Sequence, residues 1–403
     1  MISETALRWG GGGSIIRELS AYGAQRAREV GPENVFDFAI GSPSADPPAA
    51  LHAAVRRLMD SVPPAELHTY VPAPGIPAVR AKIADYLNCS FSMAYRPEDI
   101  CLTDGASSAL ALLCRVLLAP GEEVIIPTPA FPEYWVYAEA MGATVKAVPC
   151  LAESFQLDLA ALEAAVTERT ALVILNSPNN PSGAVYPRED LEQLTAMLSR
   201  RERELGRPIY LLADEPYREL VYGGTEVPFL PGMYPDAIYC YSFSKSLSIP
   251  GERVGFLALH PEAAERDRLF DAIQGAMRIT GYLCVSPLFQ LAAAECLGAT
   301  ADVSVYERNR DLICGGLRQL GYRFPEPQGA FYLLLKAPEG DGRAFSRRCM
   351  AEDVLVVPGE EFFCPGYVRL AYCVPEERLR RALPAFRKIA ESYGILPDRK
   401  SVV

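Results

Sequence analysis

Four apolar runs in this sequence each end in a short polar cluster that could do chemistry. ICLT is followed by Asp104–Ser108, ALVIL by Asn176–Gly183, IYLLA by Asp214–Tyr217 and AIYCY by Ser242–Lys245. Such runs are typical of strands buried on both faces of a sheet, and ligands of open α/β sheets bind at the carboxyl ends of the strands. We therefore expect the four clusters to meet in one site.

Among these residues, Lys245 is the one whose possible reaction is clearest. It closes the short polar cluster that follows an apolar run, and a buried ammonium group is costly to desolvate. Desolvation lowers the pKa of a lysine and frees its amine for Schiff-base chemistry. Ser242 and Arg253 would supply a hydroxyl and a guanidinium to a phosphate. For an isolated S-x-x-K sequence, the alternative is a surface lysine at a strand exit.

Asp214 and the turn Gly105–Ser107 could bind charged groups of opposite sign. Asp214 ends an apolar run, and a buried carboxylate needs a cationic partner. Gly105, Ala106 and Ser107 begin a predicted helix, whose free N–H groups and dipole would attract an anion. Ordinary helix capping is the alternative in both places.

The elements that must hold these residues follow an alternating pattern. Strand-length apolar runs alternate with helical stretches, and the runs lie at 124–126, 144–148, 171–175, 209–213, 237–241 and 254–259. This alternation predicts an α/β domain built on a mostly parallel sheet. After about residue 285, a long helical stretch, three apolar runs and a final helix predict an α+β unit.

Composition excludes several classes of protein. The chain has 403 residues and a net charge of −11 without a basic block, which argues against nucleic acid as a partner. Eleven scattered cysteines without C-x-x-C spacing, and only three histidines, indicate no metal site and favour a reducing compartment. The N-terminus lacks a signal-peptide pattern and no apolar run reaches about 18 residues. We expect a cytoplasmic protein without membrane contact.

The sequence resembles the class I/II aminotransferases, which belong to the aspartate aminotransferase superfamily and use pyridoxal 5'-phosphate (PLP). The resemblance covers nearly the full chain, in matching order and spacing, through Gly41-x-Pro, Tyr70, GASSAL, FPEYW, NSPNNPSG, ADEPY, YSFSKSLSIPGERVG and YVRLAY. It implies an α/β fold type I PLP-transferase, with a large, mostly parallel seven-stranded sheet domain and a smaller discontinuous α+β domain. We expect residues 1–48 to form an N-terminal arm and part of the small domain, 49–287 the PLP-binding domain and 288–403 the small domain.

The resemblance also implies catalytic roles. Lys245 would form the Schiff base with PLP and shuttle the Cα proton of the substrate, and Asp214 would keep the pyridine nitrogen protonated. Tyr217 and Asn180 would donate to the ring's phenolic oxygen, and Tyr134 would stack on the ring face.

The remaining implied roles are binding roles. The phosphate cup would consist of Gly105, Ala106, Ser107, Ser242 and Arg253.

Arg369 would grip the substrate α-carboxylate with its guanidinium fork, Asn180 would also bind the substrate, and Gly41 would close over the carboxylate. Tyr70 would reach the phosphate of a neighbouring subunit, which implies a homodimer with shared active sites. A packed aromatic in a proline-rich loop is the alternative for Tyr70.

The implied reaction transfers an amino group from an L-amino acid to a 2-oxo acid. Arg278 lies near the place where aspartate-specific relatives carry a partner-subunit arginine, although a solvated helix-end arginine is the alternative. Ser107 stands where some dicarboxylate-specific relatives have a lysine, so aspartate and glutamate as well as aromatic and aliphatic donors remain open. A C–S β-lyase or another α/β-elimination enzyme is the alternative on the same fold.

Overall fold

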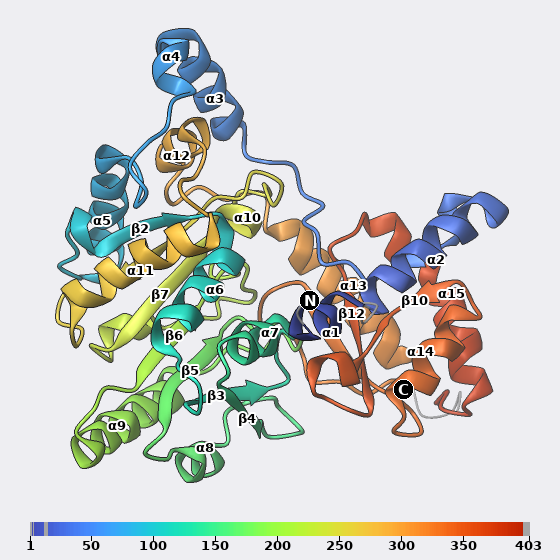
Figure 1. The fold of residues 1–403 in the computed structure, drawn as a ribbon. Coiled ribbons are helices and arrows are strands. Elements are labelled where there is room, and N and C mark those ends of the chain that lie inside the picture. Colours follow the sequence, from blue (N-terminus) through green and yellow to red (C-terminus); the bar gives the residue numbers. More distant parts are fainter. Residues whose placement is uncertain (1, 3, 12–14, 398–403) are drawn as a thin grey trace.

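The computed structural model describes residues 2, 4–11 and 15–397, and these form two domains (Figure 1). The large domain surrounds a seven-stranded sheet, and the small domain contains two short sheets. Parts of the predicted N-terminal arm, residues 1, 3 and 12–14, lie outside the described residues.

The large sheet has the strand order β2-β8-β7-β6-β5-β3-β4. Its pairs are parallel except for those of β8, which is antiparallel to both β2 and β7. The strands are β2 (Ile100–Thr103), β3 (Glu123–Thr128), β4 (Thr144–Pro149), β5 (Thr170–Asn176), β6 (Tyr210–Asp214), β7 (Ala237–Ser242) and β8 (Gly255–Leu259). The predicted mostly parallel seven-stranded sheet is confirmed.

The apolar runs form buried strands because helices cover both faces of the sheet. Val173 and Leu211 pack on one face, whereas their neighbours Leu172 and Leu212 pack on the other. One face is covered by α3 (Ala49–Ser61), α5 (Pro77–Phe91), α8 (Leu159–Ala165), α9 (Arg188–Leu205) and α12 (Pro287–Ala294), and the other by α6 (Gly105–Leu117), α7 (Glu133–Ala140) and α11 (Arg266–Thr280). The run in β4 is the exception, because this edge strand is largely exposed or half-buried.

The small domain is assembled from both ends of the chain. Phe36 and Phe38 pack in one cluster with Val354 and Phe386, which confirms the discontinuous domain. Its strands are β1 (Phe36–Asp37), paired with β10 (Val354–Leu355), and β11 (Val357–Pro358), β12 (Tyr367–Ala371) and β9 (Tyr332–Lys336), which form an antiparallel sheet. Its helices are α2 (Ile15–Val30), α13 (Ser304–Gln319), α14 (Gly342–Met350) and α15 (Glu376–Ser392).

Helix α12 corrects the domain boundary predicted between residues 287 and 288. Leu288, Leu291 and Ala292 pack with the core of the large domain, against α3 and α5. After α12, the next residue that packs with the small-domain cluster is Val303. The apolar face of α12 thus continues the large domain, and we place the boundary after this helix.

The two domains meet beside the start of α7. Trp135 of α7 stacks on Phe363 with ring centroids 3.6 Å apart, and the N–H of Ala130 donates to the carbonyl of Phe362 at 3.1 Å. The remaining short elements are α1 (Glu4–Gly11), α4 (Pro64–Leu67), α10 (Phe243–Ser246), η1 (Pro32–Asn34), η2 (Pro97–Asp99), η3 (Leu230–Gly232) and η4 (Gly359–Phe362). Among the described helices, none combines the length and apolar character needed to cross a bilayer.

Candidate active site

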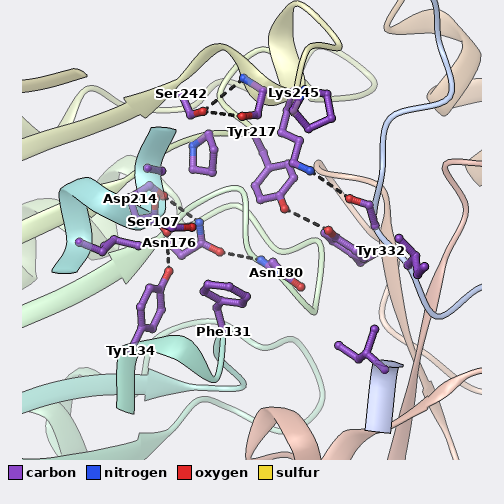
Figure 2. A pocket seen from close by; sticks show the side chains of 18 of the residues that line it. Ser107, Phe131, Tyr134, Asn176, Asn180, Asp214, Tyr217, Ser242, Lys245 and Tyr332 are labelled. Carbon is purple, nitrogen blue, oxygen red and sulfur yellow. Dashed lines mark hydrogen bonds between the residues drawn. The ribbon is translucent and has the colours of Figure 1, made fainter. Parts of the chain in front are cut away.

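A cavity of about 290 Å³ lies between the domains, where the parallel strands of the large sheet end. This is the position at which open α/β sheets bind ligands. Figure 2 shows side chains from the strand ends facing side chains of the small domain across it. All four polar clusters predicted from the sequence contribute to its lining, through Ala106, Ser107, Asn176, Asn180, Asp214, Tyr217, Ser242 and Lys245.

Asp214 is the last residue of β6, and its side chain is almost fully buried. Its Oδ2 accepts a hydrogen bond from the Tyr134 hydroxyl at 2.6 Å, whereas its Oδ1 has no hydrogen-bond partner among the described residues. Burial raises the pKa of Asp214 to about 7, the bond from Tyr134 opposes this rise, and the charge of Glu215 adds to it. A buried carboxylate oxygen without a donor is costly, so this position suits a cationic donor.

Asn176, the first residue of the polar cluster after the run ALVIL, holds the neighbouring strand end in place, although the sequence predicted no role for it. It is the last residue of β5 and lies opposite Asp214 in the register. Its Nδ2 donates to the carbonyl of Asp214, and its Oδ1 accepts from the N–H of Asn180, both at 2.7 Å (Figure 2). Its place at the end of an apolar run was the available signal.

Lys245 lies in α10, directly after β7, and its Nζ donates to the carbonyl of Gly41 at 3.0 Å. Burial lowers its pKa to about 8, and the charges of Arg253 and Arg369 act in the same direction. A Cβ on residue 41 would lie 2.0 Å from the hydroxyl of Tyr332, so glycine is required where the small-domain loop approaches Lys245. The structure therefore presents a buried, easily deprotonated amine.

The predicted phosphate-cup residues lie together at the N-terminus of α6. Gly105 has φ +77°, and a Cβ there would come within 2.7 Å of Arg253 Nη2. This guanidinium nitrogen donates to the carbonyl of Asp104 at 3.1 Å. Ala106, Ser107, Ser242 and Arg253 all line the cavity. Backbone donors, hydroxyls and a guanidinium thus meet at the positive end of a helix, an arrangement that suits a phosphate.

Arg369 extends from β12 into the cavity and is 4% exposed. Its Nη1 donates to Asn180 Oδ1 at 3.1 Å and its Nη2 to the carbonyl of Ala39 at 2.5 Å. Its Nε has no hydrogen-bond partner within the described part of the chain. The rings of Tyr332 and Phe362 lie 4.7 and 4.5 Å from the guanidinium carbon. Both Nη atoms are thus held by the protein, and the free Nε could take part in binding a carboxylate.

Tyr217 and Tyr332 meet across the cavity from the two domains. Their buried hydroxyls lie 3.0 Å apart, and either could be the donor (Figure 2). The sequence predicted a role for Tyr217 but none for Tyr332. An aromatic at the start of the apolar run FYLLLKA is typical of a core residue, so the sequence offered no signal of its contact with Tyr217.

Tyr134, for which the sequence predicted stacking on the coenzyme ring, contacts Asp214 through its hydroxyl. Its hydroxyl is bound to Asp214, and its ring lies nearly perpendicular to that of Phe131, with centroids 5.7 Å apart. Phe131, which the sequence analysis did not assign, lines the same cavity (Figure 2). Tyr134 therefore approaches the site through its hydroxyl, and Phe131 is the better candidate for an aromatic contact with a planar ligand.

Tyr70 and Arg278, which the sequence assigned to the site, lie away from the cavity of this single chain. The side chain of Tyr70 is 91% exposed, and Arg278, in the last turn of α11, is also exposed. Neither lines the cavity.

Comparison with known proteins assigns the whole arrangement to one family. The family model for class I and II aminotransferases matches residues 33–386. An amino transferase from Eubacterium rectale, known from a crystal structure, superposes with a TM-score of 0.95 at 42% identity, covering 98% of this chain and 99% of that one.

Two curated relatives extend this similarity. A probable aspartate aminotransferase of Methanocaldococcus jannaschii is 30% identical, with 94% of this chain and 97% of the relative covered. An aspartate/prephenate aminotransferase of Thermus thermophilus is 33% identical, with 87% and 89% covered. The chain therefore belongs to the class I and II aminotransferase family, whose members depend on PLP, and it is a transaminase that moves an amino group from an amino acid to a 2-oxo acid.

Proposed function

We propose that this transaminase binds PLP in the cavity between its domains and that Lys245 is the amine that attaches the coenzyme and moves the substrate's proton. One observation carries the proposal. The buried amine of Lys245 lines the same cavity as Asp214, whose buried Oδ1 has no hydrogen-bond partner among the described residues. A reactive amine and an unsatisfied anion are what an aldehyde with a cationic ring nitrogen requires.

The other lining residues fit the rest of the coenzyme. The N-terminus of α6 with Ser107, Ser242 and Arg253 would hold the phosphate. Phe131 would lie against the ring face, and Tyr217 would donate to the phenolic oxygen, together with Asn180.

When bound, PLP supplies a protonated ring that takes up the electrons released as the Cα–H bond of the substrate breaks. The chain supplies the rest. Asp214 would keep its negative charge beside the ring nitrogen. Lys245 would accept the Cα proton of the substrate as a general base and then donate it to the coenzyme as a general acid. With its pKa lowered to about 8, Lys245 is suited to both directions near neutral pH.

Arg369 would orient the substrate by binding its α-carboxylate. Its guanidinium is already fixed by Asn180 and by the carbonyl of Ala39, so little conformational freedom is lost on binding. The carbonyl of Gly41, which accepts from Lys245, brings the loop of the small domain to the same place. The substrate would thus be held between Arg369 and Lys245.

For the amino donor we propose aspartate or glutamate. The two curated relatives named above are a probable aspartate aminotransferase and an aspartate/prephenate aminotransferase, which supports a dicarboxylic donor. Arg278 is exposed in this chain and would act only from a neighbouring subunit. A panel of amino acids with 2-oxoglutarate and with pyruvate, with both keto-acid formation and ammonia release measured, tests this. Ammonia release without an acceptor would instead indicate elimination.

We further propose that the protein is a homodimer in which Tyr70 completes the active site of the partner subunit. We also propose that it works in the cytoplasm. Tyr70 is 91% exposed and carries a phenol that can bind a phosphate, and the eleven cysteines form no disulfide among the described residues. Light scattering would measure the oligomeric state. Mixing Lys245→Ala with an inactive Tyr70→Ala variant should restore about a quarter of the wild-type activity, because half the dimers would be mixed and carry one intact site. A mixture that stays inactive while its subunits exchange would contradict the shared site.

The decisive test of the whole proposal is the attachment residue. Borohydride reduction of the PLP-loaded protein, followed by peptide mass spectrometry, should find the reduced coenzyme on Lys245. Lys245→Ala should lose the label and turnover, whereas Lys336→Ala, which removes an exposed lysine of β9, should keep both. Label on another lysine, or turnover by Lys245→Ala, would refute the assignment.

A further inference from the structure

The carboxylate of Asp214 makes different contacts through its two oxygens. Oδ2 accepts the Tyr134 hydroxyl at 2.6 Å, whereas Oδ1 is buried beside the cavity without a hydrogen-bond partner in the described residues. The backbone carbonyl of Asp214 is held separately by Asn176. The bond from Tyr134 therefore decides which carboxylate oxygen remains available to a ligand.

Tyr134 is suited to be a permanent donor. It is 1% exposed in the first turn of α7, and its ring is wedged edge-on against Phe131. Burial and then the charge of Asp214 raise the pKa of this phenol well above its usual value, so its proton stays in place. A phenol that donates to a carboxylate at 2.6 Å makes a short, charge-assisted hydrogen bond.

This bond acts against the rest of the surroundings of Asp214. Burial and the charge of Glu215 both raise the pKa of Asp214 and favour its neutral form. Glu215 is itself paired with Arg218, which limits its effect. A hydrogen bond to the ionised form favours that form, so Tyr134 is the neighbour that supports the negative charge.

We propose that Tyr134 is a positioning residue that fixes Oδ2, keeps the Asp214 carboxylate charged and thereby presents Oδ1 to the protonated ring nitrogen of PLP. The inference rests on the proposed function, because it assumes that PLP lies against Asp214. It replaces the stacking role that the sequence suggested with an electrostatic one, exerted through another residue.

The consequence concerns the position of one proton. A proton shared between the ring nitrogen and Oδ1 lies on the nitrogen when the carboxylate is the weaker base. Removing the Tyr134 hydroxyl strengthens the carboxylate as a base and draws that proton toward Oδ1. The ring then carries less positive charge, and binding of the ring becomes weaker.

The test compares Tyr134→Phe with Tyr234→Phe. Tyr234 is equally buried, donates to the carbonyl of Ile209 at 2.8 Å and does not line the cavity, so it controls for the loss of a buried hydroxyl. We expect Tyr134→Phe to raise the PLP dissociation constant by about 10- to 100-fold. The ¹⁵N resonance of ring-labelled PLP should move toward its unprotonated position. Tyr234→Phe should change neither quantity.

A double-mutant cycle separates positioning from packing. In an Asp214→Ala background, Tyr134→Phe should weaken PLP binding no further, because the hydroxyl has lost the group through which it acts. Equal weakening in both backgrounds, or an unchanged ¹⁵N resonance in Tyr134→Phe, would overturn the inference.

A second variant keeps the test informative if Tyr134→Phe does not fold. Fluorotyrosine at position 134 preserves the shape of the ring and makes the phenol a stronger donor, so the ¹⁵N resonance should move in the opposite direction, toward the protonated position. A shift toward the unprotonated position would contradict the inference. If the wild-type protein itself bound no PLP, the proposed function would fail, independently of Tyr134.

Discussion

The two walls of the cavity are held in different ways. The strand-end wall belongs to the large domain and consists of Asn176, Asp214, Ser242 and Lys245, whereas the small-domain wall consists of Gly41, Tyr332 and Arg369. In the strand-end wall, residues on adjacent strands of one sheet hold each other in place. For example, the side chain of Asn176 donates a hydrogen bond to the backbone carbonyl of Asp214.

The small-domain wall depends on contacts between domains. Arg369 reaches Asn180, and the carbonyl of Gly41 accepts from Lys245, across 189 and 204 residues of sequence. The position of the strand-end wall therefore follows from one sheet, whereas the position of the small-domain wall also depends on how the two domains are placed. We expect changes in the first wall to affect the chemical step and changes in the second to affect substrate capture.

The largest effect should come from Asp214 in the strand-end wall. Asp214→Asn keeps the size of the side chain and removes its charge, so we expect kcat to fall by about 10²- to 10⁴-fold. Steady-state kinetics at saturating PLP would measure this. If Asp214→Asn raised KM and left kcat unchanged, the strand-end wall would not act on the chemical step.

Arg369 provides the matching test in the small-domain wall. Arg369→Lys keeps the charge and loses the planar fork, so kcat/KM should fall by about 10- to 100-fold, mainly through KM. PLP binding should not change. Arg318→Lys, a conservative change at an exposed arginine of α13, is the control. A loss confined to kcat would contradict the division between the walls.

The charge state of Lys245 sharpens the comparison through pH. A lysine whose pKa is lowered to about 8 is neutral above that pH and protonated below it. Capture of PLP by the coenzyme-free protein needs the neutral amine, so its rate should fall about tenfold per pH unit below 8 and level off above it. Stopped-flow absorbance would follow the rate. A rate that rises steadily toward the usual lysine pKa would show that the amine is not desolvated before PLP binds.

The two walls also differ in how far the sequence could predict them. Apolar runs that end in polar clusters located Asp214 and Lys245, because the strand ends of one sheet must lie side by side. The contacts of Arg369 with Ala39 and of Tyr217 with Tyr332 join distant segments, and no local pattern encodes them.

Resemblance alone pointed to Arg369. It also suggested stacking by Tyr134 and gave no sign of the hydrogen bond from its hydroxyl to Asp214. The boundary at residue 287 was misplaced for a similar reason, since helical spacing in α12 does not reveal which domain its apolar face packs against.

The smallest expected effect concerns Tyr332, which belongs to the small-domain wall but touches a residue of the large domain. Tyr332→Phe removes the hydroxyl that lies 3.0 Å from that of Tyr217 and keeps the ring beneath Arg369. The support for the substrate carboxylate therefore remains, and the loss falls on Tyr217. We expect kcat to fall by about 2- to 10-fold, with KM within about twofold of the wild-type value.

This change tests whether the effect of a residue on kcat or KM follows the domain it belongs to or the side chains it contacts. Tyr322→Phe is the control, because its hydroxyl donates to the carbonyl of Phe386 within the small domain, away from the cavity. If Tyr332→Phe lowers kcat alone, a side chain of the small domain acts on the chemical step through Tyr217, and the division follows contacts. If it raises KM alone, Tyr332 acts through Arg369, and the division follows the domains.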